Sequence, residues 1–215
     1  ATHGKPSEAN AHPHSDASGR IALVHNGIVE NHRELRKELE AEGVEFLSDT
    51  DTEVIVHLVA RELSKLEEAG AGATLADGVR EAMQYVEGYY AIAVLRTGDE
   101  PELVAARQGP PLCIAVTEDG AWLASDVLAL LPHTREVVFL EDGDVAQLAP
   151  AQYEVFRADG ERVERLPEEI TWREEDAQLT GFDHHMQKEI HEQPSVLARM
   201  VASRVGVGDA LLGAG

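Results

Sequence analysis

Residues Ile21-Ala22-Leu23-Val24-His25-Asn26-Gly27 combine a short apolar run with an Asn-Gly dipeptide. The run Ile21–Val24 is too short for a helix and is typical of a buried strand. Asn-Gly is a common turn signal, so we expect the strand to end in a tight turn. A chemical role is the alternative, since the Asn26 amide and the Gly27 backbone N–H could both donate to a developing oxyanion.

Three helices are predicted after this strand. Asn31 can cap the first, with Glu34 at the third helical position, and Thr50 and Glu53 have capping-box spacing at the start of the second. The third is predicted from Thr74 as its cap, apolar periodicity along it and Gly88 at its end. The helices are expected over residues 31–43, from residue 50, and over residues 74–88.

From Tyr89 onward the sequence changes to short apolar or alternating runs separated by Gly, Pro and Asp, which is typical of antiparallel strands. Hairpins are predicted across Asp142-Gly143, joining Val137–Leu140 to Val145–Leu148, and across Asp159-Gly160. Several runs are apolar on both faces. We therefore expect an α+β fold in which the sheets are covered on both sides. The other runs are residues 89–95, 103–106, 112–116 and 122–124.

The C-terminal part of the chain has a different character. Residues 167–184 are acidic at their start and have little periodicity, which predicts a linker. A helix is predicted over His185–Glu192, broken at Pro194 and resumed beyond it.

Charge and composition exclude several classes of function. Lys and Arg number 18 against 40 Asp and Glu, giving a net charge of −22. A field this acidic repels nucleic acid and anionic membrane surfaces. No apolar run approaches the roughly 18 residues of a membrane span, and no signal peptide is evident. We therefore expect a soluble, cytoplasmic protein with no nucleic-acid or membrane partner.

Asp51 lies in the first turn of the second predicted helix, within Ser48-Asp49-Thr50-Asp51-Thr52-Glu53. An acid there commonly complements the helix dipole. Because Thr50 and Glu53 can satisfy the cap, the Asp51 carboxylate could instead bind a cationic group such as a substrate ammonium.

The histidines and the cysteine give weaker indications of a chemical role. Five histidines fall in the first 32 residues, but their spacing matches no metal motif, so we expect structural or surface roles and no metal site. Cys113 is the single cysteine and lies in a core-strand pattern without a basic neighbour. We expect it to be buried and inert.

Taken together, several ordered motifs closely resemble one family, the glutaminase domains of the glutamine:fructose-6-phosphate aminotransferases (isomerizing), which are class II glutamine amidotransferases. The His-Asn-Gly and Thr-Asp-Thr-Glu pieces resemble the class broadly. The Met186-Gln187-Lys188-Glu189-Ile190 piece resembles the junction into the sugar isomerase half. The motifs are Ala1-Thr2-His3-Gly4, Asn10-Ala11-His12-Pro13-His14, Val24–Asn31, Ser48–Ile55, Ala124-Ser125-Asp126, Phe139–Asp144 and His185–Pro194.

The resemblance implies an N-terminal-nucleophile hydrolase fold, a four-layer αββα sandwich of antiparallel sheets, here lacking its first strands. It also implies three regions. Residues 1–166 would be a glutamine amidotransferase type 2 domain, residues 167–184 an acidic linker, and residues 185–215 the start of a sugar isomerase (SIS) domain.

In the family, an N-terminal cysteine attacks the glutamine amide with its own α-amino group as base, and a γ-glutamyl thioester is then hydrolysed. The ammonia converts fructose 6-phosphate to glucosamine 6-phosphate. On this sequence the resemblance implies that Asn26 and Gly27 form the oxyanion hole, that Asp51 holds the glutamine α-ammonium, and that Thr2 and His3 line the glutamine pocket. It implies no cofactor, and a homodimer for the full-length protein.

The family's N-terminal cysteine and its isomerase half do not occur in this sequence. We therefore predict a fragment truncated at both ends, inactive by itself and aggregation-prone through exposed sheet faces. Two alternatives stay open. One is another class II amidotransferase, of the amidophosphoribosyltransferase or asparagine synthetase type, and the other is a non-catalytic module that binds glutamine or glutamate.

Overall fold

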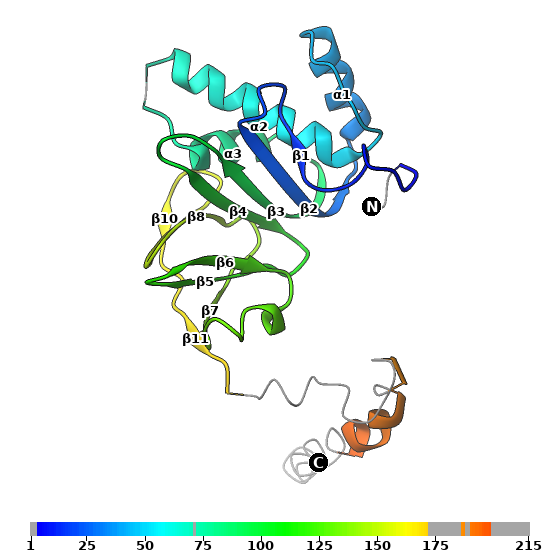
Figure 1. The fold of residues 1–215 in the computed structure, drawn as a ribbon, viewed down its shortest axis with the longest axis vertical. Helices are drawn as coiled ribbons and strands as arrows, with labels where there is room; N and C mark the ends of the chain where they lie inside the picture. The colour runs from blue at the N-terminus through cyan, green and yellow to red at the C-terminus, as the bar shows by residue number, and fades with distance from the viewer. Residues whose placement is uncertain (1–3, 71, 172–185, 188–189, 199–215) are drawn as a thin grey trace, which may run out of the picture. The chain divides into compact units, whose positions relative to one another are not determined.

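The computed structural model describes residues 4–70, 72–171, 186–187 and 190–198. The chain forms two compact units, Ala1–Thr171 and Trp172–Gly215. The first unit contains every helix and strand labelled in Figure 1.

The strand predicted at Ile21–Val24 is longer than expected. β2 runs over Ile21–Val29, pairing on one side with the short β1 (His14–Ser15) and on the other with β3 (Gly88–Arg96). The tight turn predicted at Asn26-Gly27 is therefore wrong, because both residues lie inside the ladder, where Gly27 is the partner of Tyr90. The chain turns instead after Val29, ahead of α1.

Three helices form where the sequence predicts them: α1 (His32–Ala41), α2 (Asp51–Glu68) and α3 (Leu75–Met83). α3 begins with a complete capping box between Thr74 and Asp77.

The caps of the other two helices differ from prediction. Asn31 precedes α1 but makes no side-chain cap, because its amide donates to the Tyr85 carbonyl and its Oδ1 accepts from the Glu87 N–H. Thr50 does cap α2, accepting from the Glu53 N–H at 3.4 Å. The Glu53 side chain, however, bonds the preceding loop rather than the cap residue.

The larger sheet has seven strands in the order β1-β2-β3-β4-β8-β9-β10, and every adjacent pair is antiparallel. β9 and β10 form the hairpin predicted across Asp159-Gly160, with Val163 opposite Val155. The remaining strands of this sheet are β4 (Glu102–Gln108), β8 (Val145–Ala149), β9 (Gln152–Phe156) and β10 (Arg162–Val163).

The smaller sheet has the order β11-β7-β5-β6. Its strands are β5 (Cys113–Thr117), β6 (Gly120–Ala124), β7 (Glu136–Phe139) and β11 (Glu168–Glu169). β7 pairs with β5 and β11, whereas β8 pairs with β4 and β9. The hairpin predicted across Asp142-Gly143 is therefore wrong. That turn carries the chain from one sheet to the other.

Helices α1–α3 lie on one side of the seven-stranded sheet, and the four-stranded sheet lies on the other (Figure 1). This confirms the α+β class with antiparallel sheets. In residues 4–171 the described layers are helical, β and β. The 3₁₀ turn η1 (Val127–Ala129) follows β6, and Leu130 after it packs with Cys113 and Ile170.

The segment predicted as a linker begins inside the sheet. β11 pairs with β7, and the buried Ile170 exchanges hydrogen bonds with Arg135. Residues 172–185 lie outside the described residues. In the second unit, residues 190–198 are helical through Pro194, so the predicted break there is wrong.

Candidate functional site

A cleft of about 290 Å³ opens between the two sheets, on the face of β2 and β3 that points away from the helices. Asn26 lies in its wall and is exposed, which places its amide where a ligand can reach it. The lining residues are His12, Val24, His25, Asn26, Ala91, Ile92, Ala93, Leu112, Leu123, Ala124 and Ser125.

Gly27 follows Asn26 in a backbone conformation that requires glycine. Its φ is +152°, and a Cβ at this position would lie 2.0 Å from the carbonyl oxygen of Tyr89 in the neighbouring strand. The close approach of β3 therefore fixes the residue type. The positive φ of Gly27 also makes the strand irregular beside Asn26.

Asp51 is 4% exposed at the first position of α2. Its Oδ2 accepts the backbone N–H of Val29 at 2.9 Å, which joins the start of α2 to the end of β2. The helix dipole favours a negative charge at this position. The carboxylate thus lies beside the strand that carries Asn26.

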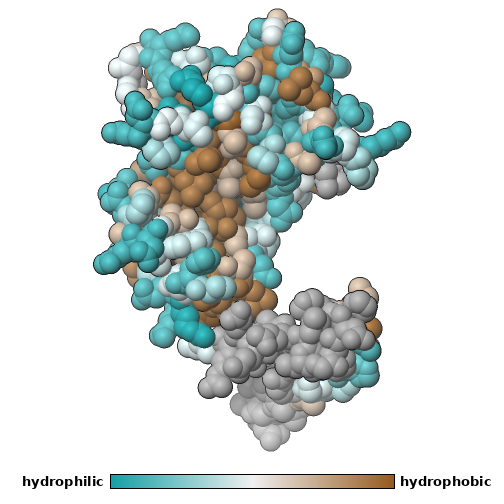
Figure 2. All heavy atoms as spheres, viewed as in Figure 1, coloured by the Kyte–Doolittle hydropathy of each residue, from teal (hydrophilic) through white to brown (hydrophobic). Residues whose placement is uncertain are grey.

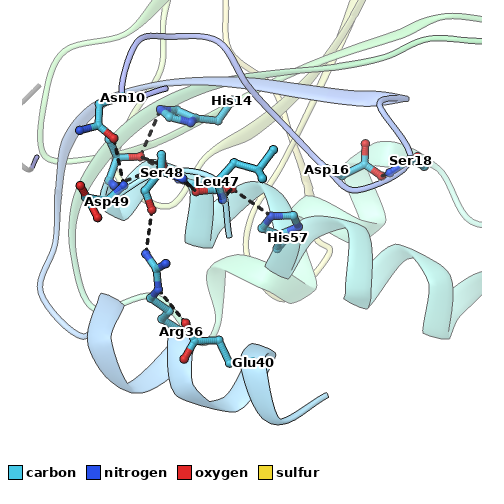
Figure 3. A network of polar contacts seen from close by, with 12 residues as sticks. Asn10, His14, Asp16, Ser18, Arg36, Glu40, Leu47, Ser48, Asp49 and His57 are labelled. Carbon is cyan, nitrogen blue, oxygen red and sulfur yellow. Dashed lines mark hydrogen bonds and ion pairs between the residues drawn. The ribbon is translucent and has the colours of Figure 1, made fainter. Parts of the chain in front are cut away.

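A buried polar network surrounds the first turn of α2 (Figure 3). Glu53 accepts the N–H groups of Leu47 and Ser48, each at 2.7 Å, and the Ser48 hydroxyl at 2.6 Å. Burial opposes ionisation of Glu53, but these hydrogen bonds outweigh it and hold the pKa of this carboxyl below its usual value. The Asp49 N–H donates to Asn10 at 2.9 Å. The loop that leads into Asp51 is thereby fixed at several points.

The N-terminal histidines belong to this network. His14 Nε2 contacts the Thr50 hydroxyl at 3.1 Å, and His25 Nδ1 contacts the Thr52 hydroxyl at 3.2 Å. Both rings are buried, and burial lowers the pKa of His14. These contacts support the predicted structural role. In the part of the chain that the structure describes, no three His, Cys, Asp or Glu side chains are placed to hold a metal ion.

Two predicted binding residues, Thr2 and His3, lie outside the described residues. Cys113 is buried as predicted, and its thiol donates to the Ala124 carbonyl. Burial raises the pKa of this thiol to about 11, which leaves it protonated at neutral pH and unsuited to act as a nucleophile.

The opposite wall of the cleft was not predicted. Leu112 precedes β5 and Ser125 follows β6, so both lie at the open end of the β5–β6 hairpin, which a sequence pattern cannot place against β2. Arg107, near the end of β4, fixes the segment that leads to Leu112. Its guanidinium donates to the carbonyls of Pro110 at 2.8 Å and Gly109 at 3.0 Å. The signal for this wall was the Ala-Ser-Asp motif at Ser125, which sequence reasoning noted without assigning a role.

The fold and the cleft define a class. The structure of a glutamine phosphoribosylpyrophosphate amidotransferase from B. subtilis matches with a TM-score of 0.55 at 25% identity, covering 71% of this chain and 32% of that one. A second solved structure, described as the allosteric regulatory enzyme of purine biosynthesis, matches with a TM-score of 0.52 at 23% identity, over 68% of this chain and 30% of that one. The chain has the N-terminal-nucleophile hydrolase fold of class II glutamine amidotransferases.

The sequence places the chain within that class. Residues 3–132 match the glutamine amidotransferase domain family, and the chain belongs to it. A glutamine–fructose-6-phosphate aminotransferase (isomerizing) of Thermus thermophilus is 48% identical over 205 residues, covering 95% of this chain and 32% of the relative. The enzyme of the same name from Thermotoga maritima is 44% identical over 95% of this chain and 32% of its own length. The chain thus spans about a third of the length of these curated relatives.

Among the described residues, no helix is long and apolar enough to cross a membrane.

Proposed function

We propose that this chain supplies the oxyanion-stabilising and glutamine-binding part of a glutaminase site, in an enzyme that hydrolyses glutamine to glutamate and ammonia. The observation that carries the proposal is the placement of Asn26 in the wall of the cleft, next to the distorted backbone of Gly27. Donors that are fixed before the reaction stabilise a developing negative charge most effectively.

The chemistry follows from that placement. When a nucleophile adds to the glutamine side-chain amide, the carbonyl oxygen gains negative charge, and the Asn26 side-chain N–H and the Gly27 backbone N–H are the donors we assign to it. Cys113 does not fit the nucleophile, because it is buried and protonated. The resemblance assigns the attack to an N-terminal cysteine outside residues 1–215, so this chain provides one side of the site.

Asp51 is assigned to the α-ammonium of glutamine. Its buried carboxylate is held by the Val29 N–H at 2.9 Å and lies at the helix N-terminus. Hydrogen bonds from an ammonium to a carboxylate are short and stronger than neutral ones. Thr2 and His3 complete the proposed pocket on the strength of the resemblance.

The full protein would use the ammonia to convert fructose 6-phosphate to glucosamine 6-phosphate. The support is the name of the relatives and their 44–48% identity over 95% of this chain. On this proposal residues 1–166 are the amidotransferase domain and residues 185–215 begin the isomerase domain, where fructose 6-phosphate would bind. A homodimer and a cytoplasmic location remain predictions from the same resemblance.

The test is a glutaminase assay of the full-length polypeptide that contains this chain, comparing wild type with Asn26→Ala. We expect kcat to fall roughly 100- to 1000-fold with little change in KM for glutamine, because the donor acts on charge that develops only in the transition state. Asn31→Ala is the matched control. It removes the same amide in a loop that does not line the cleft, and kcat should be unchanged.

Three results would contradict the proposal or one part of it. Wild-type protein without glutaminase activity would favour the non-catalytic glutamine-binding module. Equal kcat in wild type and Asn26→Ala would show that Asn26 is not an oxyanion donor. Glutaminase activity without product from fructose 6-phosphate would point to one of the other class II amidotransferases.

A further inference from the structure

Two consecutive residues in the first turn of α2 contact β2 on either side of Asn26-Gly27. The Asp51 carboxylate accepts from the Val29 N–H at 2.9 Å, and the Thr52 hydroxyl lies 3.2 Å from His25 Nδ1. The strand is therefore attached to the helix at residues 25 and 29, and the assigned oxyanion donors lie between the two attachments.

Thr52 is an unusual choice for this position if packing were its only task. It is 3% exposed, in a turn where the neighbouring core residues are Val54, Ile55 and Val56. A buried hydroxyl is costly unless it is hydrogen-bonded, and a valine would fill the same volume. The contact of the Thr52 hydroxyl with His25 explains why threonine occupies this position.

That oxygen contacts a second ring. His12 Nε2 lies 3.4 Å from the Thr52 hydroxyl, and His12 is among the residues that line the cleft. A hydroxyl that bridges two neutral imidazoles donates its one hydrogen to one ring and accepts from the other. In a His12–Thr52–His25 chain, either both rings carry their proton on Nε2 or both carry it on Nδ1.

The His25 ring lies next to the Gly27 backbone, because a Cβ at residue 27 would be 2.8 Å from His25 Nε2. Side chains alternate along a strand, so His25 points toward the helices while Asn26 points into the cleft. Gly27 has φ +152°, which glycine adopts readily, and it lies close to the Tyr89 carbonyl. A shift of the His25 ring would rotate the strand at Asn26 and move both donors.

We propose that Thr52 is a positioning residue of the glutaminase site, whose hydroxyl holds His25 and through it sets the direction of the Asn26 and Gly27 donors. Thr52 does not line the cleft and does not act on substrate. The inference rests on the proposed function, and it adds a residue that acts on turnover rather than on glutamine binding.

The kinetic test compares Thr52→Val, which removes the hydroxyl at constant shape, with Thr52→Ser, which keeps it, in the full-length polypeptide. We expect Thr52→Val to lower kcat about 10- to 100-fold, as small displacements of catalytic groups do, while KM for glutamine stays within about twofold because Asp51 is retained. Thr52→Ser should keep kcat near the wild-type value. An unchanged kcat in Thr52→Val, or an equal fall in Thr52→Ser, would overturn the proposal.

A second measurement does not depend on activity. Nitrogen NMR of the His12 and His25 rings reports which ring nitrogen is protonated. We expect matching tautomers in wild type and in Thr52→Ser, and loss of the match in Thr52→Val. Opposite tautomers that are the same in all three proteins would overturn the bridge. If wild type shows matching tautomers but no glutaminase activity, the proposed function fails while the hydroxyl contact stands, so the two failures are distinguishable.

Discussion

The two faces of the seven-stranded sheet are covered to very different extents. On the helical side, side chains from β2, β3 and β4 pack against α1–α3, and Leu23 is only 1% exposed. On the other side, the smaller sheet covers Ala105 and Ala146 but leaves part of β2 and β3 open. Val24, the next residue after Leu23 in β2, is therefore 40% exposed. Figure 2 shows apolar side chains gathered on the surface of the first unit in this view.

This difference separates two tasks within one strand. The closed face of β2 holds the strand in place through Leu23, Val29 and the contacts of His25 to α2. The open face presents Asn26 to the cleft. A site on a rigid strand is positioned more accurately than one on a loop, and here the rigidity comes from the side opposite the chemistry.

The largest expected effect tests this contrast with two neighbours. Leu23→Ala should lower the free energy of unfolding by about 2–5 kcal/mol, because it leaves a cavity in a closed core. Val24→Ala should cost less than about 1 kcal/mol, because its side chain already contacts solvent. Urea titration of both variants measures the two values. Equal losses would show that the open face is covered in solution.

A smaller effect tests the contrast with charge. Arg165 pairs with Asp144, which is 1% exposed, at 2.8 Å and 3.0 Å, and with Glu141, whose side chain is 64% exposed, at 2.8 Å. Asp144→Asn should lower the free energy of unfolding by about 1.5–3 kcal/mol, as for a buried charged hydrogen bond. Glu141→Gln should change it by less than about 0.5 kcal/mol. Thermal melts of the two variants at one pH provide the comparison, and a larger loss in Glu141→Gln would contradict it.

The smallest effect concerns pH. Burial and the neighbouring His12 lower the pKa of His14 below its ordinary value of 6.5, against the opposing charges of Glu53 and Asp51. The unfolded chain therefore takes up the proton first, and the stability that His14 contributes at neutral pH is lost as pH falls from 6.5 toward the folded-state value.

We expect the melting temperature to fall between pH 7.5 and pH 5.5, and to fall less in His14→Gln. An unchanged slope in His14→Gln would show that this ring titrates equally in both states.

The helical layer could be predicted because its signals are local. Thr50 and Thr74 begin α2 and α3, and the apolar period of each helix specifies the buried face. The Asp159-Gly160 hairpin was predictable for the same reason, since its two strands are adjacent in sequence and in the sheet.

Errors arose where a distant partner decides the outcome. Asn26-Gly27 has the composition of a turn, yet pairing with β3, where Gly27 lies opposite Tyr90, keeps both residues within a strand. The runs around Asp142-Gly143 have the composition of a hairpin, yet each finds a better partner in a different sheet. Asn31 could cap α1, but it bonds the segment before β3 instead. In each case tertiary contacts override local propensity.

The site also contains residues that could be predicted from the sequence and residues that could not. Asn26, Gly27 and Asp51 are predicted from motif resemblance. Asn26 lines the cleft, whereas Asp51 is 4% exposed and bonds the Val29 N–H, and the assigned roles stay predictions. The supports of the site were missed, because Thr52 and Glu53 read only as residues of a helix start. Their contacts to His25 and to the loop at Ser48 are visible only once strand and helix are packed together.

The crossing of the chain between sheets at Asp142-Gly143 bears on how the protein folds. Neither sheet can be completed from neighbouring segments alone: β5 must find β7 across η1, and β2 must find β3 across three helices. Pairings between distant segments raise the contact order and slow folding, commonly to milliseconds or longer. The helices are the elements able to form early, and the cleft between the sheets can exist only after the late long-range pairings are made.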